Sequence, residues 1–372
     1  MKKLCISLLI SFLGLLPTTL SAQNEYPDSL LRRYAAKMLM VGFRGDSVTD
    51  NCDAARYVRD LHVGGIILFD VDLTGTKELG SRNITSKERL SAMTTKLQSL
   101  SDGKLIIALD QEGGRVARLK PQYGYTPTVS HEYLGLINSR DTTTHYAAIM
   151  ARELAESGVN MNLAPDIDIL NPDCPVIGKL HRAFSADTLT VTQNAEWFID
   201  AHSAYGVTCA VKHFPGHGSS MADSHYGLTD VTNTWDTSEL SPFSTLINNG
   251  KLQAVMTAHI FNRNIDQDYP ATLSHKTLTG LLREKLGFEG LILTDDMYMQ
   301  GIIDNYSIEE AVTLAINAGA DILVMGNNIS TGFEPERPFR IVDIIIDAVH
   351  AGKISPARLK ESYDRINRYI NF

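Results

Sequence analysis

The sequence predicts an α/β fold, a single-domain (β/α)8 barrel of the TIM type, and three observations carry this prediction. Eight short runs rich in Val, Ile, Leu and Met recur along the 372 residues. Helical patterns lie between these runs, and no Pro/Ser-rich linker divides the chain. Eight strand–helix units in one chain fit a closed barrel better than a doubly wound sheet with a second domain.

The predicted strands are continuously apolar rather than alternating, which indicates burial on both faces, as in a parallel sheet. We expect them at residues 38–43, 65–69, 105–110, 159–164, 209–213, 254–259, 291–295 and 322–326.

Two of the predicted helices have recognisable starts. Thr85 and Glu88 are spaced to form a capping box before an apolar face at 90–100, and Ser307 and Glu310 have the same spacing before a second helix. Glycine permits the left-handed backbone that ends a helix. Several helices should therefore end at a glycine just before the next strand, at residues Gly158, Gly206, Gly287 and Gly319.

Composition and charge exclude several classes of protein. The chain is 44% hydrophobic and 21% charged, which is ordinary for a folded protein and argues against disorder or a coiled coil. Its net charge is −9, and it has no Lys/Arg-rich block. Such a chain offers no electrostatic footprint for a phosphate backbone, so we expect no nucleic-acid partner.

The N-terminus has the layout of a secretory signal peptide: Lys2 and Lys3, an apolar stretch, and small residues ending at Ala22. The alternative is a membrane anchor, but about a dozen apolar residues fall short of the roughly 20 needed to cross a bilayer. We expect cleavage of residues 1–22, export to the periplasm or beyond, and no membrane anchor afterwards. The mature chain keeps Cys52, Cys174 and Cys209, which do not form a disulfide framework, and pairing of the last two stays open.

Ionisable residues follow five of the predicted strands, where a barrel places its active site. They are Asp110 to Arg115, Asp166 and Asp168, Lys212 and His213, His259, and Asp295 and Asp296. Each alone could cap a helix or form a structural ion pair. Five strand ends together favour a polar active-site mouth.

Three histidines in the segment 213–225 raise a choice between metal and proton chemistry. His213 and His217 stand four apart, as metal ligands on a helix do, but Pro215, Gly216 and Gly218 make a helix improbable here. Asp223 and His225 are two apart, so a turn can bring the carboxylate to the imidazole and leave its other nitrogen free to transfer a proton. A solvated turn is the alternative.

Four segments resemble the signature segments of glycoside hydrolase family 3, and more closely its β-N-acetylglucosaminidase branch, which serves bacterial cell-wall recycling. They are Lys-His-Phe-Pro-Gly-His-Gly at 212–218, Asp-Ser-His at 223–225, Asp-Gln-Glu-Gly-Gly-Arg-Val at 110–116 and Leu-Thr-Asp-Asp-Met at 293–297. The likeness runs from about residue 38 to 326. It implies a catalytic barrel over residues 23–372.

The resemblance implies a retaining mechanism. Asp295 is the implied nucleophile and forms a covalent glycosyl-enzyme; Asp296 is its competitor, and only one of two adjacent strand residues can face the substrate. His225, oriented by Asp223, is the implied general acid and base. Because a neutral imidazole does not repel an anion, phosphate remains a rival to water as the acceptor.

By motif position, sugar binding falls to Asp110, Arg118, Arg182, Lys212 and His213. The alternative for Arg118 and Arg182 is a structural ion pair with Asp166 or Asp168. The segment before Arg182 also departs from the family pattern, because the link from Gly178 to the arginine is longer than usual.

The resulting prediction is an exported, monomeric β-N-acetylhexosaminidase that needs no metal and no cofactor. Its expected substrates are muropeptides, other peptidoglycan fragments or related oligosaccharides. The signal peptide itself departs from many cytoplasmic relatives. The rivals are a metal-dependent barrel hydrolase using His213, His217 and His225, a family 3 enzyme for another sugar, and an inactive carbohydrate-binding protein.

Overall fold

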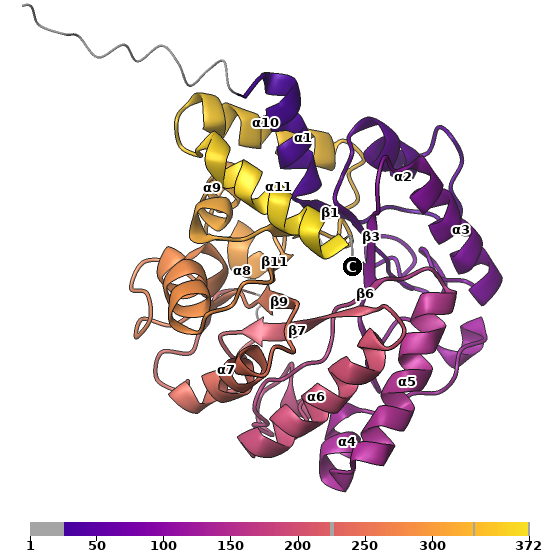
Figure 1. The fold of residues 1–372 in the computed structure, drawn as a ribbon, viewed down its shortest axis with the longest axis vertical. Helices are drawn as coiled ribbons and strands as arrows, with labels where there is room; N and C mark the ends of the chain where they lie inside the picture. Colours follow the sequence, from indigo (N-terminus) through magenta and orange to yellow (C-terminus); the bar gives the residue numbers. More distant parts are fainter. Residues whose placement is uncertain (1–25, 224–226, 330–331, 371–372) are drawn as a thin grey trace, which may run out of the picture.

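A computed structural model describes residues 26–223, 227–329 and 332–370 of the chain. Eight parallel strands close into a barrel, which Figure 1 shows as a ribbon. The strand order is β1-β12-β11-β9-β7-β6-β3-β2, and β1 pairs with both β12 and β2. The barrel strands are β1 (Leu39–Val41), β2 (Gly65–Ile67), β3 (Ile106–Leu109), β6 (Met161–Asn162), β7 (Thr208–Phe214), β9 (Ala254–Thr257), β11 (Leu291–Asp296) and β12 (Ile322–Met325). Each overlaps one predicted run, so the predicted fold class is confirmed.

Helices surround this barrel in the described part of the chain (Figure 1). The α-helices are α1 (Asp28–Lys37), α2 (Asp53–Ala55), α3 (Lys87–Leu100), α4 (His131–Ile137), α5 (Arg140–Glu156), α6 (Thr188–Ser203), α7 (Ser241–Asn248), α8 (Gln300–Ile303), α9 (Ile308–Ala318), α10 (Arg337–His350) and α11 (Pro356–Ile370). The 3-10 helices are η3 (Pro121–Tyr123), η4 (Gly178–Leu180), η5 (Thr237–Leu240) and η6 (Ala271–Leu273). The π-helices are η2 (Arg56–Asp60) and η7 (Lys276–Lys285).

Two small sheets lie outside the barrel. β4 (Gln111–Gly113) and β5 (Val116–Ala117) form an antiparallel hairpin directly after β3. β8 (Thr229–Asp230) pairs in parallel with β10 (Ile260–Phe261). Both sheets follow barrel strands, so they belong to the loops at the carboxyl-end face.

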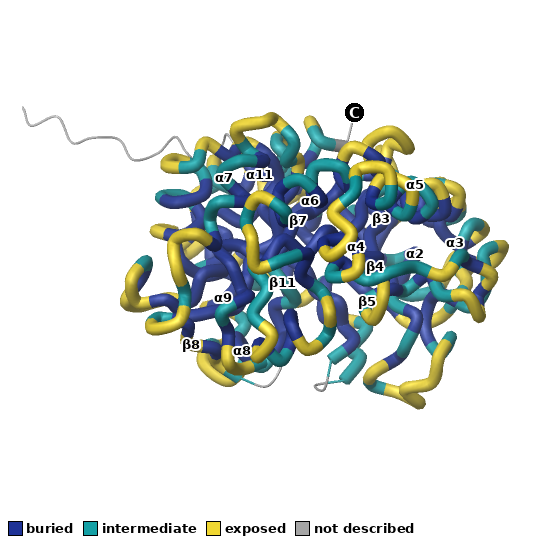
Figure 2. The backbone as a smooth tube through the Cα atoms, turned by 90° about the horizontal axis from the view of Figure 1, so that it is seen from below, coloured by how far each residue is buried: buried dark blue, intermediate teal, exposed yellow. Residues whose placement is uncertain are grey.

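The core is continuous from the strands to the inner faces of the helices. All four residues of β3, β9 and β12 are buried, which explains their unbroken apolarity. α10 buries one face, including Ile341, Val342, Ile345 and Ile346, as an amphipathic helix on a barrel does. Figure 2 shows this layering, with buried residues inside and exposed ones on the outer turns.

Helix starts confirm one predicted capping box and correct the other. Ser307 and Glu310 exchange the expected hydrogen bonds at the start of α9. The box at Thr85 and Glu88 was wrong: Ser86 caps α3 by accepting from the amide of Arg89, and Thr85 donates to Asp46 instead. Ser and Thr stand side by side here, so spacing alone could not choose between them.

The predicted glycines have the expected conformation. Positive φ angles of 72°, 70°, 73° and 121° occur at Gly158, Gly206, Gly287 and Gly319. The three cysteines in the described residues, Cys52, Cys174 and Cys209, are free thiols, which decides the open question about Cys174 and Cys209.

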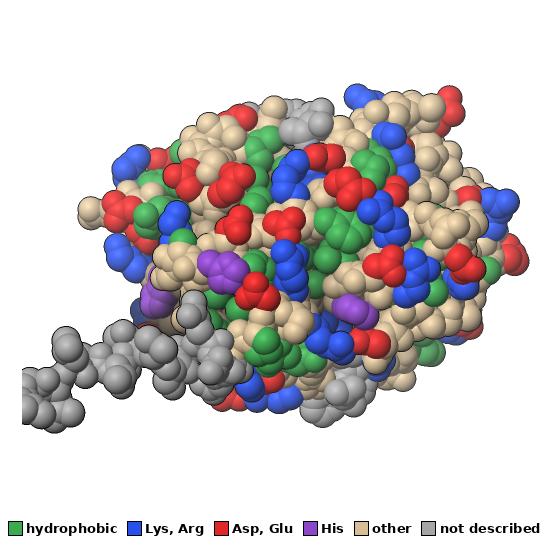
Figure 3. All heavy atoms as spheres, turned by 90° about the horizontal axis from the view of Figure 1, so that it is seen from above, with side chains coloured by type: hydrophobic (Ala, Val, Ile, Leu, Met, Phe, Trp, Pro, Cys, Tyr) green, Lys and Arg blue, Asp and Glu red, His purple; other side chains and the backbone are tan. Residues whose placement is uncertain are grey.

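No helix in the ranges described above combines the length and apolarity needed to span a membrane. On the face shown in Figure 3, acidic and basic side chains are interspersed rather than gathered into a patch of one sign. The predicted signal peptide at residues 1–22 lies outside the described residues.

Candidate active site

The hairpin after β3 brings two predicted sugar-binding residues together. Gln111 accepts the backbone amides of Arg118 and Leu119 through its side-chain oxygen, which folds β5 back over β4. Gly113 and Gly114 make the reversal with positive φ. As a result, Arg118 Nη2 donates to Asp110 Oδ2 at 2.9 Å.

Opposite charges alternate across the mouth of the barrel, from the end of β2 to the end of β7. Lys212 Nζ lies 2.8 Å from Asp110 Oδ1 and 2.7 Å from Glu112 Oε1. Glu112 in turn receives two hydrogen bonds from Arg182, at 2.7 and 2.9 Å. At the other end, Asp70 contacts Arg118 and Lys120; the full order is Lys120, Asp70, Arg118, Asp110, Lys212, Glu112, Arg182.

These pairs keep the groups ionised despite their burial. Burial opposes ionisation of Asp110, but Lys212 and Arg118 outweigh it and lower its pKa. Glu112 behaves alike, with Arg182 and Lys212 lowering its pKa against burial. The pKa of Lys212, whose side chain is 3% exposed, is raised by Asp110 and Glu112 against the opposing effect of burial. The mouth is thus preorganised to donate to and accept from hydroxyl groups.

The alternative prediction, that Arg118 and Arg182 form structural ion pairs with Asp166 or Asp168, is confirmed only for Arg182 with Asp166. Arg182 Nη2 lies 3.4 Å from Asp166 Oδ2, but its closest carboxylate partner is Glu112. Arg118 pairs with Asp110 and Asp70, not with Asp166 or Asp168.

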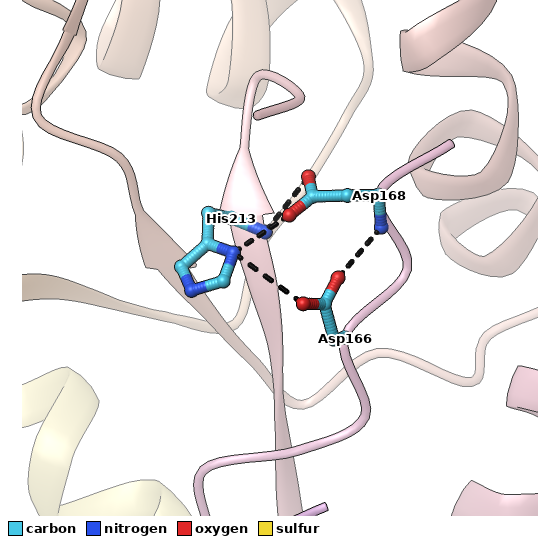
Figure 4. A group of neighbouring side chains, drawn as sticks. All are labelled: Asp166, Asp168 and His213. Carbon is cyan, nitrogen blue, oxygen red and sulfur yellow. Dashed lines mark hydrogen bonds and ion pairs between the residues drawn. The ribbon is translucent and has the colours of Figure 1, made fainter. Parts of the chain in front are cut away.

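Asp166 and Asp168 lie in the segment that follows β6 and runs alongside β7. Backbone pairing continues there, since the amide of Ile167 donates to the carbonyl of Lys212. Asp168 Oδ2 accepts from His213 Nδ1 at 2.7 Å, while Asp166 Oδ1 accepts from the amide of Asp168 (Figure 4). Both aspartates are buried.

The loop after β7 passes close to the chain that follows β6. A Cβ on Gly218 would lie 2.0 Å from the carbonyl oxygen of Ile169, so only glycine fits there. Farther along, Asp223 is half-buried. Its predicted partner His225 lies outside the described residues, so the structure does not test the proposed acid–base pair.

The adjacent acids at the end of β11 differ in what they contact. Asp296 accepts the amides of Tyr298 and Gly326, one on each oxygen, at 3.0 Å. His259 donates from Nε2 to the carbonyl of Asp296 at 2.9 Å and so supports the same backbone. The carboxylate of Asp295 accepts from the amide of Asp296 at 2.8 Å. Asp296 is thus bonded into the backbone around it.

One group of possible metal ligands was found in the described ranges: Asp166, Asp168 and His213, with ligand atoms within 4.8 Å of one another. Two carboxylates and an imidazole are a suitable donor set by type. Their surroundings do not fit a cation, because the guanidinium of Arg182 approaches both Asp166 and His213. His213 and His217 of the rival metal set have ring centroids 5.7 Å apart.

Several residues of this site were not predicted as site residues from the sequence. Glu112 stands inside a quoted motif, and its signal was a second acid only two residues from Asp110. Asp70 directly follows the run 65–69, as an acid at a strand end. Asp168 was predicted only as a polar strand-end residue or an ion-pair partner of Arg118 or Arg182, and its contact with His213 needed the structure.

The comparisons with known proteins agree with this architecture. A family model described as "Glycosyl hydrolase family 3 N terminal domain" matches residues 30–369. A beta-hexosaminidase from Tolumonas auensis is 36% identical over 72% of this chain and 76% of its own length. The fold of this chain resembles that of a family 3 beta-N-acetylglucosaminidase structure from Paenibacillus sp. FPU-7, with a TM-score of 0.82 and 32% sequence identity. The match covers 92% of this chain and 62% of that chain. A Zn-bound protein from Thermotoga neapolitana is 28% identical, with TM-score 0.75, over 91% and 67% of the two chains.

The closed parallel barrel with charged residues at its carboxyl-end mouth defines an enzyme of the (β/α)8-barrel class. With the family match over residues 30–369, the chain belongs to glycosyl hydrolase family 3.

Proposed function

We propose that this chain is a retaining β-N-acetylglucosaminidase, which removes N-acetylglucosamine from the non-reducing end of oligosaccharides. The observation that carries the proposal is the family 3 match over residues 30–369, which includes the charged barrel mouth and Asp295 at the end of β11. The proposed sugar specificity is supported by the names of two relatives: the protein from Tolumonas auensis is a beta-hexosaminidase, and the Paenibacillus structure is a beta-N-acetylglucosaminidase.

The proposed reaction has two steps. The Asp295 carboxylate attacks the anomeric carbon, while His225 gives its proton to the leaving glycosidic oxygen, which breaks the bond to the aglycone. His225 then takes a proton from water, whose oxygen attacks the same carbon and releases Asp295. Asp223 orients the imidazole in both steps. Two displacements at one carbon leave the configuration unchanged.

The sugar is proposed to bind at the alternating charges. Asp110 accepts from hydroxyl groups, while Arg118, Arg182 and Lys212 donate to hydroxyl and N-acetyl oxygens, with His213 beside them. Because these groups are already paired with one another, they need little rearrangement when substrate replaces water.

A trapping experiment tests the nucleophile. After incubation with a 5-fluoro glycosyl reagent, we expect mass spectrometry to find the label on the peptide that carries Asp295. Asp295→Asn should lower kcat on an aryl N-acetylglucosaminide by at least about 10³-fold, and His225→Ala by about 10²- to 10⁴-fold on substrates with poor leaving groups. A label on another residue, or folded variants as active as the parent, would overturn the proposal.

Two rivals are separated by simple assays. Activity should stay within about twofold after chelation and desalting, because the proposed steps use only side chains and water; a loss that Zn²⁺ restores would favour a metal-dependent hydrolase. Added inorganic phosphate should leave free N-acetylglucosamine as the product. Formation of the sugar 1-phosphate would instead make the enzyme a phosphorylase.

We also propose that the enzyme works outside the cytoplasm, on peptidoglycan fragments, as a monomer. The signal-peptide layout of residues 1–22 supports export, and the resemblance to the cell-wall branch of the family supports the peptidoglycan substrate. When the full sequence is expressed in a Gram-negative host, the periplasmic or secreted form should begin at Gln23. A chain that keeps Met1 in the cytoplasm would refute export, and inactivity on muropeptides by an enzyme that cleaves chitin oligosaccharides would refute the substrate.

A further inference from the structure

Asp168 contacts two successive parts of the segment that follows the barrel strand β7. Its Oδ2 accepts from the imidazole Nδ1 of His213 at 2.7 Å (Figure 4). Its Oδ1 accepts from the backbone amide of His217 at 2.7 Å and from that of His213 at 3.3 Å. The residue is 1% exposed, so water does not compete for these bonds. The buried carboxylate of Asp168 thus holds both the side chain of His213 and the start of the loop that follows β7.

The neighbours of His213 define which ring nitrogen carries the proton. A carboxylate can only accept, so Nδ1 must donate to Asp168. The other nitrogen, Nε2, lies 3.3 Å from Arg182 Nη2, and a guanidinium can only donate. Nε2 therefore presents its lone pair. The bond to Arg182 is long, so a stronger donor can replace it.

We propose that Asp168 is a positioning residue of the sugar site: it holds His213 in the Nδ1-protonated form, so that Nε2 accepts a hydrogen bond from one hydroxyl of the N-acetylglucosamine unit. This inference rests on the proposed function. It adds an acceptor to a mouth where Lys212, Arg118 and Arg182 supply donors, and a sugar hydroxyl needs both kinds of partner. The ionised state of Asp168 is consistent with this role, since His213 and the His217 amide lower its pKa to about 2 against the opposing effect of burial.

Asp166 offers a matched control. It is as deeply buried as Asp168, but its Oδ2 lies 4.0 Å from His213 Nδ1, too far for a hydrogen bond. Burial and the charge of Asp168 raise the pKa of Asp166, so asparagine resembles its protonated form. Asp166→Asn should therefore leave the tautomer of His213 unchanged.

The tautomer is read directly by NMR on the full chain with isotope-labelled histidine nitrogens. Long-range proton–nitrogen spectra distinguish the two neutral tautomers, and His213→Gln identifies the signal. We expect the Nδ1-protonated form in the wild type and in Asp166→Asn. In Asp168→Asn, the amide oxygen keeps the two backbone amides, and the amide nitrogen then faces Nδ1 as a donor, so the proton should move to Nε2. A wild-type signal from the Nε2-protonated form, or no change in Asp168→Asn, overturns the inference.

Kinetics supply the functional half of the test. Asp168→Asn should lower kcat/KM by roughly 10- to 100-fold, the range expected for losing hydrogen bonds to a charged group. With analogues that lack one sugar hydroxyl at a time, one analogue should be penalised about tenfold more by the wild type than by Asp168→Asn, because only the wild type uses that hydroxyl. Equal penalties in both enzymes for every analogue overturn the inference.

The two levels of proposal fail in different ways. If the wild type does not hydrolyse any N-acetylglucosaminide, the proposed function is wrong. If the wild type is active but its His213 tautomer does not depend on Asp168, only this inference is wrong. The wild-type spectrum alone tests the assignment even where Asp168→Asn does not fold.

Discussion

At the scale of single residues, Asp296 shows how a neighbour of the proposed nucleophile has a different task. Its oxygens bind the amides of Tyr298 and Gly326, and a Cβ on Gly326 would lie 2.6 Å from Asp296 Oδ2. Burial and the charge of Asp295 raise the pKa of Asp296 to about 6. The sequence placed two acids at this strand end. The sequence could not say which of the two carboxylates accepts the backbone amides, because one amide belongs to Tyr298 and the other to Gly326, which lies beyond β12.

We predict that Asp296→Asn is mainly a stability variant. The side chain of asparagine has one oxygen, which can accept from only one of the two backbone amides. Its NH2 group then faces the other amide, and two donors cannot form a hydrogen bond with each other. The free energy of unfolding should fall by about 1–3 kcal/mol, the cost of a buried unpaired donor, measured by urea denaturation at neutral pH. Asp295→Asn is the matched control and should change it by less than Asp296→Asn does, because the remaining side-chain oxygen can still accept from the amide of Asp296. A larger loss for the control would show that Asp295 is the structural member of the pair.

At the scale of elements, η5 supports the loop after β7. Glu239 on η5 is 5% exposed, and its Oε2 accepts from the amide of Gly218 at 3.2 Å. Burial, together with the negative charge of Asp168, raises the pKa of Glu239 from 4.5 to about 7. Folding therefore favours the protonated acid at this contact.

The stability of the protein should depend on pH through Glu239. Because its folded-state pKa is higher than its unfolded value, this group stabilises most below pH 4.5, and the contribution is lost as pH rises to about 7. Over that window the loss is about 3 kcal/mol. Glu239→Gln does not titrate, so its stability relative to the wild type should rise between pH 4.5 and 8 by up to that amount. Urea denaturation at several pH values measures this, and a difference that stays constant with pH would contradict it.

At the scale of the whole molecule, Asp321 joins elements at the end of the barrel opposite the active-site mouth. It directly precedes β12 and accepts from Arg283 on η7 and from Arg365 on α11, each at 2.6 Å. It also accepts from Ser362 and from the amide of Ile292 on β11. Arg358 Nη2 lies 3.7 Å from Asp321 Oδ1 as a third cation. Asp321 is fully buried, so its negative charge is balanced by these arginines rather than by water.

Removing this charge should destabilise the fold without affecting catalysis. Asp321→Asn leaves Arg283 and Arg365, whose side chains are only 14% and 12% exposed, without this buried carboxylate. We expect a loss of about 3–5 kcal/mol in the free energy of unfolding. The kcat of the folded fraction should be unchanged, because this face of a barrel serves stability. Asp343→Asn, which breaks an exposed pair with Arg32, should cost less than about 1 kcal/mol. Similar losses for the two variants would contradict the argument.

The sequence by itself determined the barrel, since strands buried on both faces must be continuously apolar and all eight runs form strands. It also placed the chemistry at strand ends and predicted the family. The tertiary structure alone decided the partners: which acid binds the backbone at the end of β11, that Glu112 joins Lys212 to Arg182, and that Asp168 orients His213. These contacts join residues far apart along the chain, and a linear pattern records the type of each residue but not the one that it meets.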